Sequence, residues 1–402
     1  MRRILIVLSV LAGVLGVHAQ DGNTRMGIED VDNASLSERL LKIEKKTDAF
    51  NFYINLAGSA NETYADETWN TNINARLFRL EIKGNITPKL HYRLRHALNK
   101  SNTGHRHDGF LHATDFMMVG YHFNPHFTIQ AGKMSQVWGG FEYDEDPTYI
   151  YRYTDLVGMF ECFQVGAMFS YKPVPSQEIA LGIYRTDNGS LDEEFGENLQ
   201  LVGNSTHQVT ALSPSHHPLT YIINWNGHFL DNKLQTRWSW GLLTQARHTY
   251  SRGLTLGQRL NLPNLQWYLD FYGFWDGFDR FGIASSELGH LVDAPNAVNP
   301  RFGSVHYFTW ATKLNWQFRP QWNLMAKGTY ETASVAHIEQ FRNYRKALGA
   351  IASVEYYPVK HHDFRVYLAY LFKNNNYTAA STLPDYTEHR IELGIITRLK
   401  LY

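Results

Sequence analysis

The sequence predicts an all-β protein, a 16-stranded antiparallel transmembrane β-barrel with a short N-terminal periplasmic helix. Three observations support this fold class. The chain begins with an export signal, its apolar residues alternate with polar ones from Phe50 onward, and short connections between predicted strands alternate with long ones. Successive residues of a strand point to opposite faces, so the alternation gives each strand one apolar face and one polar face.

The first residues have the features of a cleaved secretory signal peptide. Two arginines come near the start, an uncharged stretch of 14 residues runs from Ile4 to Val17, and Ala19 provides a small residue close behind it. This stretch is too short to span a bilayer as a helix, so we expect residues 1–19 to be removed and the mature chain to be exported. Cys162 is the single cysteine, which excludes a small domain held by internal disulfides.

Residues 20–48 are predicted to form a periplasmic segment that contains a short helix. The sequence SLSE at residues 35–38 matches a capping box, in which serine and glutamate side chains satisfy free backbone N–H groups at a helix start. Apolar residues follow at helical spacing, so the helix should extend to about Lys46. Two arrangements fit it: an amphipathic helix docked against the base of the barrel, or a short trimeric coiled coil. The barrel is expected to occupy residues 49–402.

Composition narrows the classes of protein that fit. The chain has 38 basic and 38 acidic residues, so its formal net charge of zero gives no reason to expect a nucleic-acid partner. No segment after the signal peptide reaches the roughly 18 uncharged apolar residues that a membrane-spanning helix needs. Aromatic residues are abundant, with 23 Phe, 24 Tyr and 10 Trp. An exported, aromatic-rich chain of alternating strands fits either a soluble β-protein or an outer-membrane barrel.

Three features favour the barrel over a soluble β-sandwich, which shows the same alternation. A sandwich of this length would normally divide into domains, and the sequence has no linker or change of composition that marks a boundary. Tyr and Trp cluster at the ends of the predicted strands, as in the aromatic girdles at the two membrane surfaces. The predicted strands are also about ten residues long, the length that a tilted strand needs to cross a bilayer.

The predicted connections alternate in length around the barrel. Short turns are expected at residues 85–89, 124–126, 173–178, 227–233, 261–264, 317–321 and 358–362. Longer polar loops are expected at residues 59–72, 100–113, 134–160, 188–218, 276–303, 332–346 and 374–388, with a shorter one at 245–251. Seven short and eight longer connections join sixteen strands and leave both chain ends on the short-turn side, as transmembrane barrels require. The strand from Leu254 to Leu260 has the weakest pattern, and closure with an even strand count requires it.

The polar face of each strand should line a water-filled lumen in a barrel of this size. In RLEIKGNITPKLHYRLR, residues 79–95, charged side chains alternate with apolar ones across a predicted hairpin. Applied to every strand, the alternation sends twelve basic side chains inward: Arg79, Lys83, Arg93, Arg95, Arg237, Arg259, Lys313, Lys327, Arg365, Arg390, Arg398 and Lys400. It sends five acidic side chains inward: Glu81, Asp270, Glu331, Glu355 and Glu392.

This imbalance of charge predicts a lumen that favours anions. A low-dielectric wall with one sign of charge concentrates counter-ions, and guanidinium groups offer paired donors that match phosphate or carboxylate oxygens. The alternative is that many of these charges only pair across strands, as Glu81 could with Arg79 or Arg93. About half could do so, yet each such pair removes one charge of each sign, so the basic excess of seven would remain.

A longer motif links the sequence to a known family. Residues 129–147 read IQAGKMSQVWGGFEYDEDP, in which a strand ends at Ala-Gly-Lys and a Gly-Gly-aromatic-acidic segment follows. Together with the hairpin at residues 79–100, this segment resembles the phosphate-selective porin O and P family, and the resemblance covers about residues 49–402. It implies a 16-stranded, usually trimeric barrel of the bacterial outer membrane, whose third loop folds inward and whose basic residues conduct phosphate or related anions.

By this resemblance, residues 134–160 would form the constriction loop, and Lys133 would join Arg79, Arg93 and Arg95 in the basic lining. The acidic side chains of that loop would oppose a purely anionic path: Glu142, Asp144, Glu145 and Asp146. We therefore expect a porin that allows passive diffusion of small hydrophilic solutes with a preference for anions. Its expected partners are these solutes, outer-membrane lipid, the barrel-assembly machinery and two further copies in a homotrimer; no cofactor or metal is expected.

Two other classes of function remain open. Some outer-membrane barrels are hydrolases, and the histidines of the second loop (His105, His107 and His112) with Asp108 could also bind a metal ion. The sequence has no G-x-S-x-G or H-E-x-x-H motif, which weakens the enzyme hypothesis. A structural or adhesive surface protein would use the long loops at residues 188–218 and 276–303.

Overall fold

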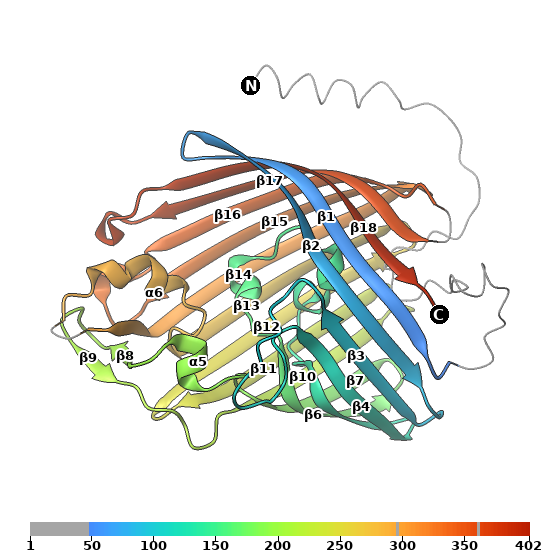
Figure 1. The fold of residues 1–402 in the computed structure, drawn as a ribbon, viewed down its shortest axis with the longest axis horizontal. Helices are drawn as coiled ribbons and strands as arrows, with labels where there is room; N and C mark the ends of the chain where they lie inside the picture. The colour runs from blue at the N-terminus through green and yellow to red at the C-terminus, as the bar shows by residue number, and fades with distance from the viewer. Residues whose placement is uncertain (1–47, 295–296, 360–361) are drawn as a thin grey trace.

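A computed structural model describes residues 48–294, 297–359 and 362–402. The predicted signal peptide and periplasmic helix lie outside these residues. The described part is a single closed sheet wound into a barrel (Figure 1). None of its helices is long and apolar enough to span a membrane.

Eighteen strands are assigned in the described residues, and β8 and β9 lie within a loop, so sixteen strands form the wall. The first eight wall strands are β1 (Asn51–Ala65), β2 (Thr68–Asn85), β3 (Leu90–Ala97), β4 (Thr114–Asn124), β5 (Phe127–Ser135), β6 (Phe163–Val174), β7 (Gln177–Arg185) and β10 (Leu219–Phe229). The other eight are β11 (Leu234–Ala246), β12 (Thr249–Leu262), β13 (Leu265–Phe278), β14 (Asn299–Arg319), β15 (Trp322–Val335), β16 (Arg345–Tyr356), β17 (Asp363–Tyr377) and β18 (Tyr386–Lys400). The predicted 16-stranded barrel is confirmed.

The wall closes because β1 pairs with β2 on one side and with β18 on the other, for example through Ala57 and Ile396. All neighbouring wall strands are antiparallel, and β7 pairs directly with β10. The intervening β8 (Leu199–Val202) and β9 (Val209–Ala211) form a small hairpin outside the wall, and β8 adds to the end of β14 in parallel. Closure leaves no open sheet edge at membrane depth, where unpaired backbone groups would be costly.

The two ends of the barrel differ as the sequence predicts. The short turns and the C-terminus lie at one end, on the right of Figure 1, and the long loops with their helices lie at the other. Two predicted loops are wrong. Instead of a loop at 59–72, β1 and β2 continue to a two-residue turn at Asp66 and Glu67, whose φ angles of 47° and 61° suit a tight hairpin. The hairpin β11–β12 likewise replaces the loop at 245–251.

The first of these errors has a clear physical cause. Residues 68–75 of β2 are exposed, so no buried face imposes an apolar alternation there, although the backbone ladder continues. Polar strands beyond the membrane therefore resemble loops in sequence. The weak strand predicted at Leu254 to Leu260 is confirmed as part of β12.

The outward face of the wall is apolar and exposed, as lipid contact requires. Trp240, Trp310 and Leu393 are 46%, 47% and 56% exposed. The largest buried apolar cluster lies instead on the inward series and on the loops, and includes Trp138 and Phe274. Near the long loops, side chains therefore fill part of the cross-section of the barrel. A passage can use only the rest of that cross-section.

The third connecting loop accounts for much of this filling. It spans residues 136–162 between β5 and β6, and we call it the constriction loop. It contains α3 (Phe141–Asp144), the 3-10 helix η2 (Pro147–Tyr149) and α4 (Asp155–Gly158). Two other loops contain α5 (Leu191–Phe195) and the pair α6 (Ile283–Leu288) and η3 (Gly289–Leu291), and the last long loops hold η4 (Glu339–Phe341) and η5 (Ala379–Ser381). The constriction loop folds across the lumen, since α3 contacts β12 and β13 while η2 contacts β1 and β18.

Candidate functional site

A cavity of about 1150 Å³ lies between the constriction loop and one side of the wall. Lys100 and Glu161 line it near the long loops, and Asn85 and Lys400 line it near the short turns. The cavity therefore extends from one end of the barrel towards the other. Among the predicted site residues, its lining includes Arg79, Lys83, Arg93, Arg95, Arg237, Arg398, Asp144, Glu145 and Asp146. This cavity is the candidate passage for solutes.

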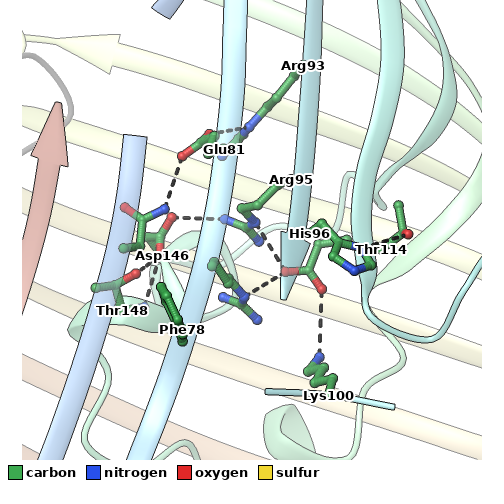
Figure 2. A network of polar contacts seen from close by, with 12 residues as sticks. Phe78, Glu81, Arg93, Arg95, His96, Lys100, Thr114, Asp146 and Thr148 are labelled. Atoms are coloured by element: carbon green, nitrogen blue, oxygen red, sulfur yellow. Dashed lines mark hydrogen bonds and ion pairs between the residues drawn. The ribbon is translucent and has the colours of Figure 1, made fainter. Parts of the chain in front are cut away.

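Two arginines of the passage share one buried carboxylate. Glu81 is fully buried and accepts hydrogen bonds from Nε of Arg93 at 2.7 Å and from Nη2 of Arg398 at 3.3 Å (Figure 2 shows Glu81 with Arg93). The Arg93 guanidinium stacks on Phe116 with 4.0 Å to the ring centroid, and that of Arg398 stacks on Tyr53 at 4.5 Å. Each guanidinium is thus fixed by one ion pair and one ring, so its position in the passage is defined.

Arg79 and Arg95 are held differently, by a carboxylate that the sequence did not predict. Nε of Arg79 lies 2.8 Å and Nε of Arg95 lies 3.2 Å from Oδ2 of Asp115, and the ammonium of Lys100 lies 3.7 Å from Oδ1. The strand register shifts between β3 and β4 at this point, because Arg95 pairs with Phe116 and the next pair skips Asp115. A β-bulge places Asp115 out of the alternating series, so no periodic pattern could reveal that it faces inward.

The acidic residues of the constriction loop bind basic residues of the wall. Asp146 accepts from Nη1 of Arg95 at 3.0 Å (Figure 2), and Glu142 accepts from Nζ of Lys327 at 2.6 Å. The remaining predicted acids form two further ion pairs: Asp144 with Arg237 and Glu145 with Lys313. The predicted basic excess of seven is therefore wrong for the folded lumen, because carboxylates from the loops fold in and offset it.

A second set of contacts secures the other end of the constriction loop. Asp155 binds Arg345 and, at 2.6 Å, the ammonium of Lys373. Backbone N–H groups of Asp155 and Leu156 donate to Glu331 at 2.8 Å and 3.2 Å. The loop is thus tied to strands β3, β11, β14, β15, β16 and β17.

The Gly-Gly step of the motif allows the loop backbone to reach the wall. The N–H of Gly140 donates to the carbonyl of Arg237 at 3.2 Å, and that of Gly139 donates to Oγ of Ser239 at 3.0 Å. A Cβ on Gly139 would lie 2.7 Å from the Arg237 carbonyl oxygen, and one on Gly140 would lie 2.4 Å from the Tyr272 hydroxyl. Gly140 also has φ of 93°, which favours glycine.

The pKa values of two carboxylates in the constriction loop are shifted in opposite directions. Burial alone would raise the pKa of Asp146, but Arg95 and the hydrogen bonds from Thr148 outweigh it and hold that pKa well below its ordinary value. Burial, reinforced by Glu194, raises the pKa of Glu161 despite the opposing effect of Lys100. Asp146 consequently keeps its negative charge at a lower pH than an ordinary aspartate does. Glu161 instead loses its charge at a higher pH than an ordinary glutamate.

Six predicted inward cations lie outside the cavity: Lys133, Arg259, Lys313, Lys327, Arg365 and Arg390. Lys313 and Lys327 are tied to the constriction loop, and Arg365 pairs with Glu355 at 2.8 Å. Arg259 hydrogen bonds Gln235 at 2.9 Å and stacks over Phe141.

Lys133 is the clearest departure, because its register partner Met117 is on the outward face and 50% exposed. Its ammonium is buried against Asp108 of the second loop at 2.6 Å. The lining role assigned to Lys133 by resemblance is therefore wrong.

The second-loop histidines do not form a metal site in the described residues. The rings of His105 and His112 lie 3.4 Å apart between centroids, while the nearby Asp108 is bound by Lys133. Among residues 48–294, 297–359 and 362–402, no group of three or more His, Cys, Asp or Glu side chains is placed to hold a metal ion.

Comparisons with known proteins agree with this geometry. The profile of the phosphate-selective porin O and P family matches residues 50–399. No curated protein sequence gives a significant match. Among solved structures, the outer-membrane channel DcaP of Acinetobacter baumannii is 10% identical, with a TM-score of 0.59 over 87% of this chain and 96% of that one. OprB of Pseudomonas putida is 11% identical, with a TM-score of 0.55 over 92% and 100% of the two chains. OmpF of Salmonella typhi is 12% identical, with a TM-score of 0.53 over 89% and 99%.

The match to the family profile covers most of the barrel, and the solved porins share its architecture. Family membership and fold together indicate a passive channel of the bacterial outer membrane and not an enzyme. The chain belongs to the phosphate-selective porin O and P family.

Proposed function

We propose that this porin allows passive diffusion of small hydrophilic solutes and prefers anions, with phosphate or a similar oxyanion as the favoured class. The observation that supports this is the pair of guanidinium groups on Glu81. Two positive charges share one negative charge there, so Arg93 and Arg398 leave a net positive charge beside the passage. Each guanidinium stacks on an aromatic ring with its face, so its N–H edge stays available to donate paired hydrogen bonds to an oxyanion.

The charges around this pair of arginines also favour a net positive passage. The loop carboxylates Asp144, Glu145 and Asp146 each have a wall cation as partner, which removes most of their effect on a passing ion. A confined passage with low-dielectric walls makes the remaining charge effective, because screening there is weaker than in bulk solution.

The test is the reversal potential of single channels in a salt gradient across a planar bilayer. The wild type should prefer anions, and the double variant Arg93→Gln/Arg398→Gln should lose much of that preference. Arg93→Glu should have a larger effect than Arg93→Gln, since it reverses the local field. All shifts should shrink as salt approaches about 1 M, where the Debye length is about 3 Å.

Lys233→Gln is the matched control, because Lys233 is exposed in the turn between β10 and β11 and does not line the passage. Its reversal potential should equal that of the wild type. A wild type that prefers cations, or a double variant with an unchanged reversal potential, would contradict the proposed selectivity.

We also propose that the barrel assembles as a homotrimer. A trimer form of OmpT of Vibrio cholerae has the same architecture, at 11% identity and a TM-score of 0.50 over 87% of this chain and 99% of that one. Light scattering of the detergent-solubilised protein measures the mass of the assembly. A mass of one chain would contradict the trimer.

A further inference from the structure

Two histidines lie against each other in the passage, at its short-turn end. The imidazole rings of His91 on β3 and His122 on β4 are stacked, with 4.7 Å between their centroids and 26° between their planes. Both residues line the candidate passage, and we call them the histidine pair. His91 is two residues from Arg93 on the same face of β3, so their Cα atoms are about 7 Å apart. An anion that leaves Arg93 towards the short turns therefore reaches the histidine pair next.

The wall provides space for the ring of His91. In register, His91 lies opposite Gly120 on β4, and Gly120 lies opposite Gln130 on β5. A Cβ at position 120 would overlap with Nε2 of His91, so the glycine leaves room for the imidazole. The ring thereby reaches across β4 to Gln130, with 3.1 Å between the two Nε2 atoms. At the next inward position of β4, Nδ1 of His122 lies 2.8 Å from Oγ1 of Thr128 on β5.

The contact with Gln130 defines the form of His91 in the structure. An amide nitrogen can only donate, so Nε2 of His91 accepts and the ring is neutral, with its proton on Nδ1. Nδ1 is buried and has no hydrogen-bond partner among the described residues. Gln130 also suits the charged ring, because after a half-turn of the amide its oxygen can accept from a protonated Nε2. His91 can therefore take up a proton without losing this contact.

The charges that face the histidine pair from the nearest elements are mainly positive. Lys83 on β2 and Arg93 on β3 point into the same part of the passage. Lys89 is exposed in the turn before β3. The carboxylate of Asp48, which also lines this end, accepts a hydrogen bond from the side chain of Asn85 at 2.9 Å.

The more distant charges do not pair with the two rings either. Lys172 on β6 lies 3.9 Å from Glu178 on β7, and Arg398 and Asp363 line the same end of the passage from its other side. Within the described part of the chain, ion pairs of histidine with a carboxylate involve other histidines and not this pair. The charge of His122 itself acts on His91. The charge state of the pair is therefore set by protons from solution and by any anion that binds.

We propose that the histidine pair is a second anion position in the passage, which holds an oxyanion such as sulfate or phosphate when the rings carry protons. Two imidazolium rings in contact repel each other, and an anion bound beside them offsets that repulsion. Anion binding and proton uptake therefore strengthen each other, as linkage requires. The pair adds no charge while the rings are neutral, and acid adds up to two positive charges. This inference rests on the proposed anion preference and adds a site to it that depends on pH.

The experiment measures reversal potentials of the full-length protein in planar bilayers, in a KCl gradient, between about pH 8 and about pH 5, which spans the ordinary range of imidazole. A background of Glu161→Gln removes the contribution of that carboxylate. Acid should raise the ratio of anion to cation permeability by about twofold or more in this background, because charge in a confined passage is poorly screened. His91→Gln/His122→Gln should remove the response.

Sulfate serves as the probe for binding, since its charge is constant over this range of pH. It should block the chloride current of the parent channel more strongly at pH 5 than at pH 8. The double variant should lose this difference. Heat-modified migration on a gel checks that the double variant is folded.

Two further variants separate the histidine pair from other causes. His126→Gln removes an imidazole from the exposed turn between β4 and β5, outside the passage, and should respond to pH as the parent does. His122→Gln leaves His91 without a charged neighbour, so about half of the response should remain and its midpoint should move to higher pH. A purely structural role of the two rings would not move this midpoint.

A double variant that keeps the full response would place the titrating groups elsewhere and overturn the proposal. Loss of the pH response with an unchanged sulfate block would also overturn it, because the pair would then alter the field without holding an anion. A parent channel that prefers cations at pH 8 would contradict the proposed function alone, since each response is measured against the same channel at pH 8.

Discussion

Arg95 on β3 donates a hydrogen bond from Nη1 to Oδ2 of Asp146 in the constriction loop, with 3.0 Å between the two atoms. The other carboxylate oxygen of Asp146 accepts from the backbone N–H and the hydroxyl of Thr148, at 2.9 Å and 2.7 Å. A single carboxylate therefore fixes the local fold of the loop and holds that fold against the wall. This contact is one of the ties that position the loop beside the passage.

Asp146→Asn should widen the passage without preventing folding of the barrel. Loss of one partner from a largely buried ion pair costs about 3 kcal/mol, and here that cost falls on loop docking, because the wall strands keep their ladders. We expect a higher single-channel conductance and larger current fluctuations in planar bilayers. Glu339→Gln, in an exposed loop outside the passage, is the control. Unchanged conductance in Asp146→Asn would show that the remaining ion pairs suffice to place the loop.

Gly140→Ala should displace the same loop by a different route. The added Cβ would approach the Tyr272 hydroxyl to 2.4 Å, and φ of 93° would cost a non-glycine residue about 2 kcal/mol. We expect altered conductance and greater susceptibility of residues 136–162 to proteolysis. Gly158→Ala is the control in the same loop, since a Cβ there would meet its nearest neighbour at an ordinary 3.6 Å. Equal effects of the two substitutions would refute the steric explanation.

Lys327→Met should lower stability more than the double variant Lys327→Met/Glu142→Leu. The single change leaves Glu142 buried without its ion-pair partner, which costs about 3–5 kcal/mol, whereas removal of both charges is often close to neutral. The temperature at which the barrel loses its folded migration on a gel measures this. A double variant that is less stable than the single one would show that the charges stabilise the fold beyond satisfying each other.

Anion preference should increase as the pH falls, and Glu161 should account for part of the increase. Its raised pKa means that it takes up a proton at a higher pH than an ordinary glutamate, and the passage then loses a negative charge. We expect the reversal potential to shift towards anion selectivity as the pH is lowered, with the change beginning at a higher pH than an ordinary glutamate would give. Glu161→Gln should show part of this shift already at neutral pH, and its reversal potential should change less with pH than that of the wild type. The idea fails if the variant titrates as the wild type does.

The sequence was sufficient to predict the architecture of the wall. Alternation of side chains depends only on which face meets lipid, and lipid imposes this on every strand at membrane depth. The predicted loop at 59–72 is really a hairpin that turns at Asp66 and Glu67, and its exposed strand ends carry no pattern that lipid imposes.

The pairing of charges in the lumen could be predicted only in part. The alternation sends Glu81, Arg93 and Arg398 inward, and of the two partners expected for Glu81 the structure shows Arg93, whereas Arg79 binds Asp115 instead. The ion pair of Glu81 with Arg398 was not predicted. The alternation says nothing about where a loop folds, so the ion pairs of Glu142 and Asp146 with distant strands could not be derived. Asp115 was missed because it sits in a bulge, where periodicity breaks down.

The ties of the constriction loop also have a mechanical consequence. A hollow cylinder of thin wall flattens easily under sideways pressure, and a crossbar between opposite sides resists this. The constriction loop leaves the wall between β5 and β6 and is bound to Lys313 on β14 and Lys327 on β15, which lie across the barrel, so it acts as such a crossbar. An oval distortion of the barrel would have to pull these ion pairs apart. The same loop that lines the passage should therefore resist changes in its cross-section when the surrounding bilayer is compressed.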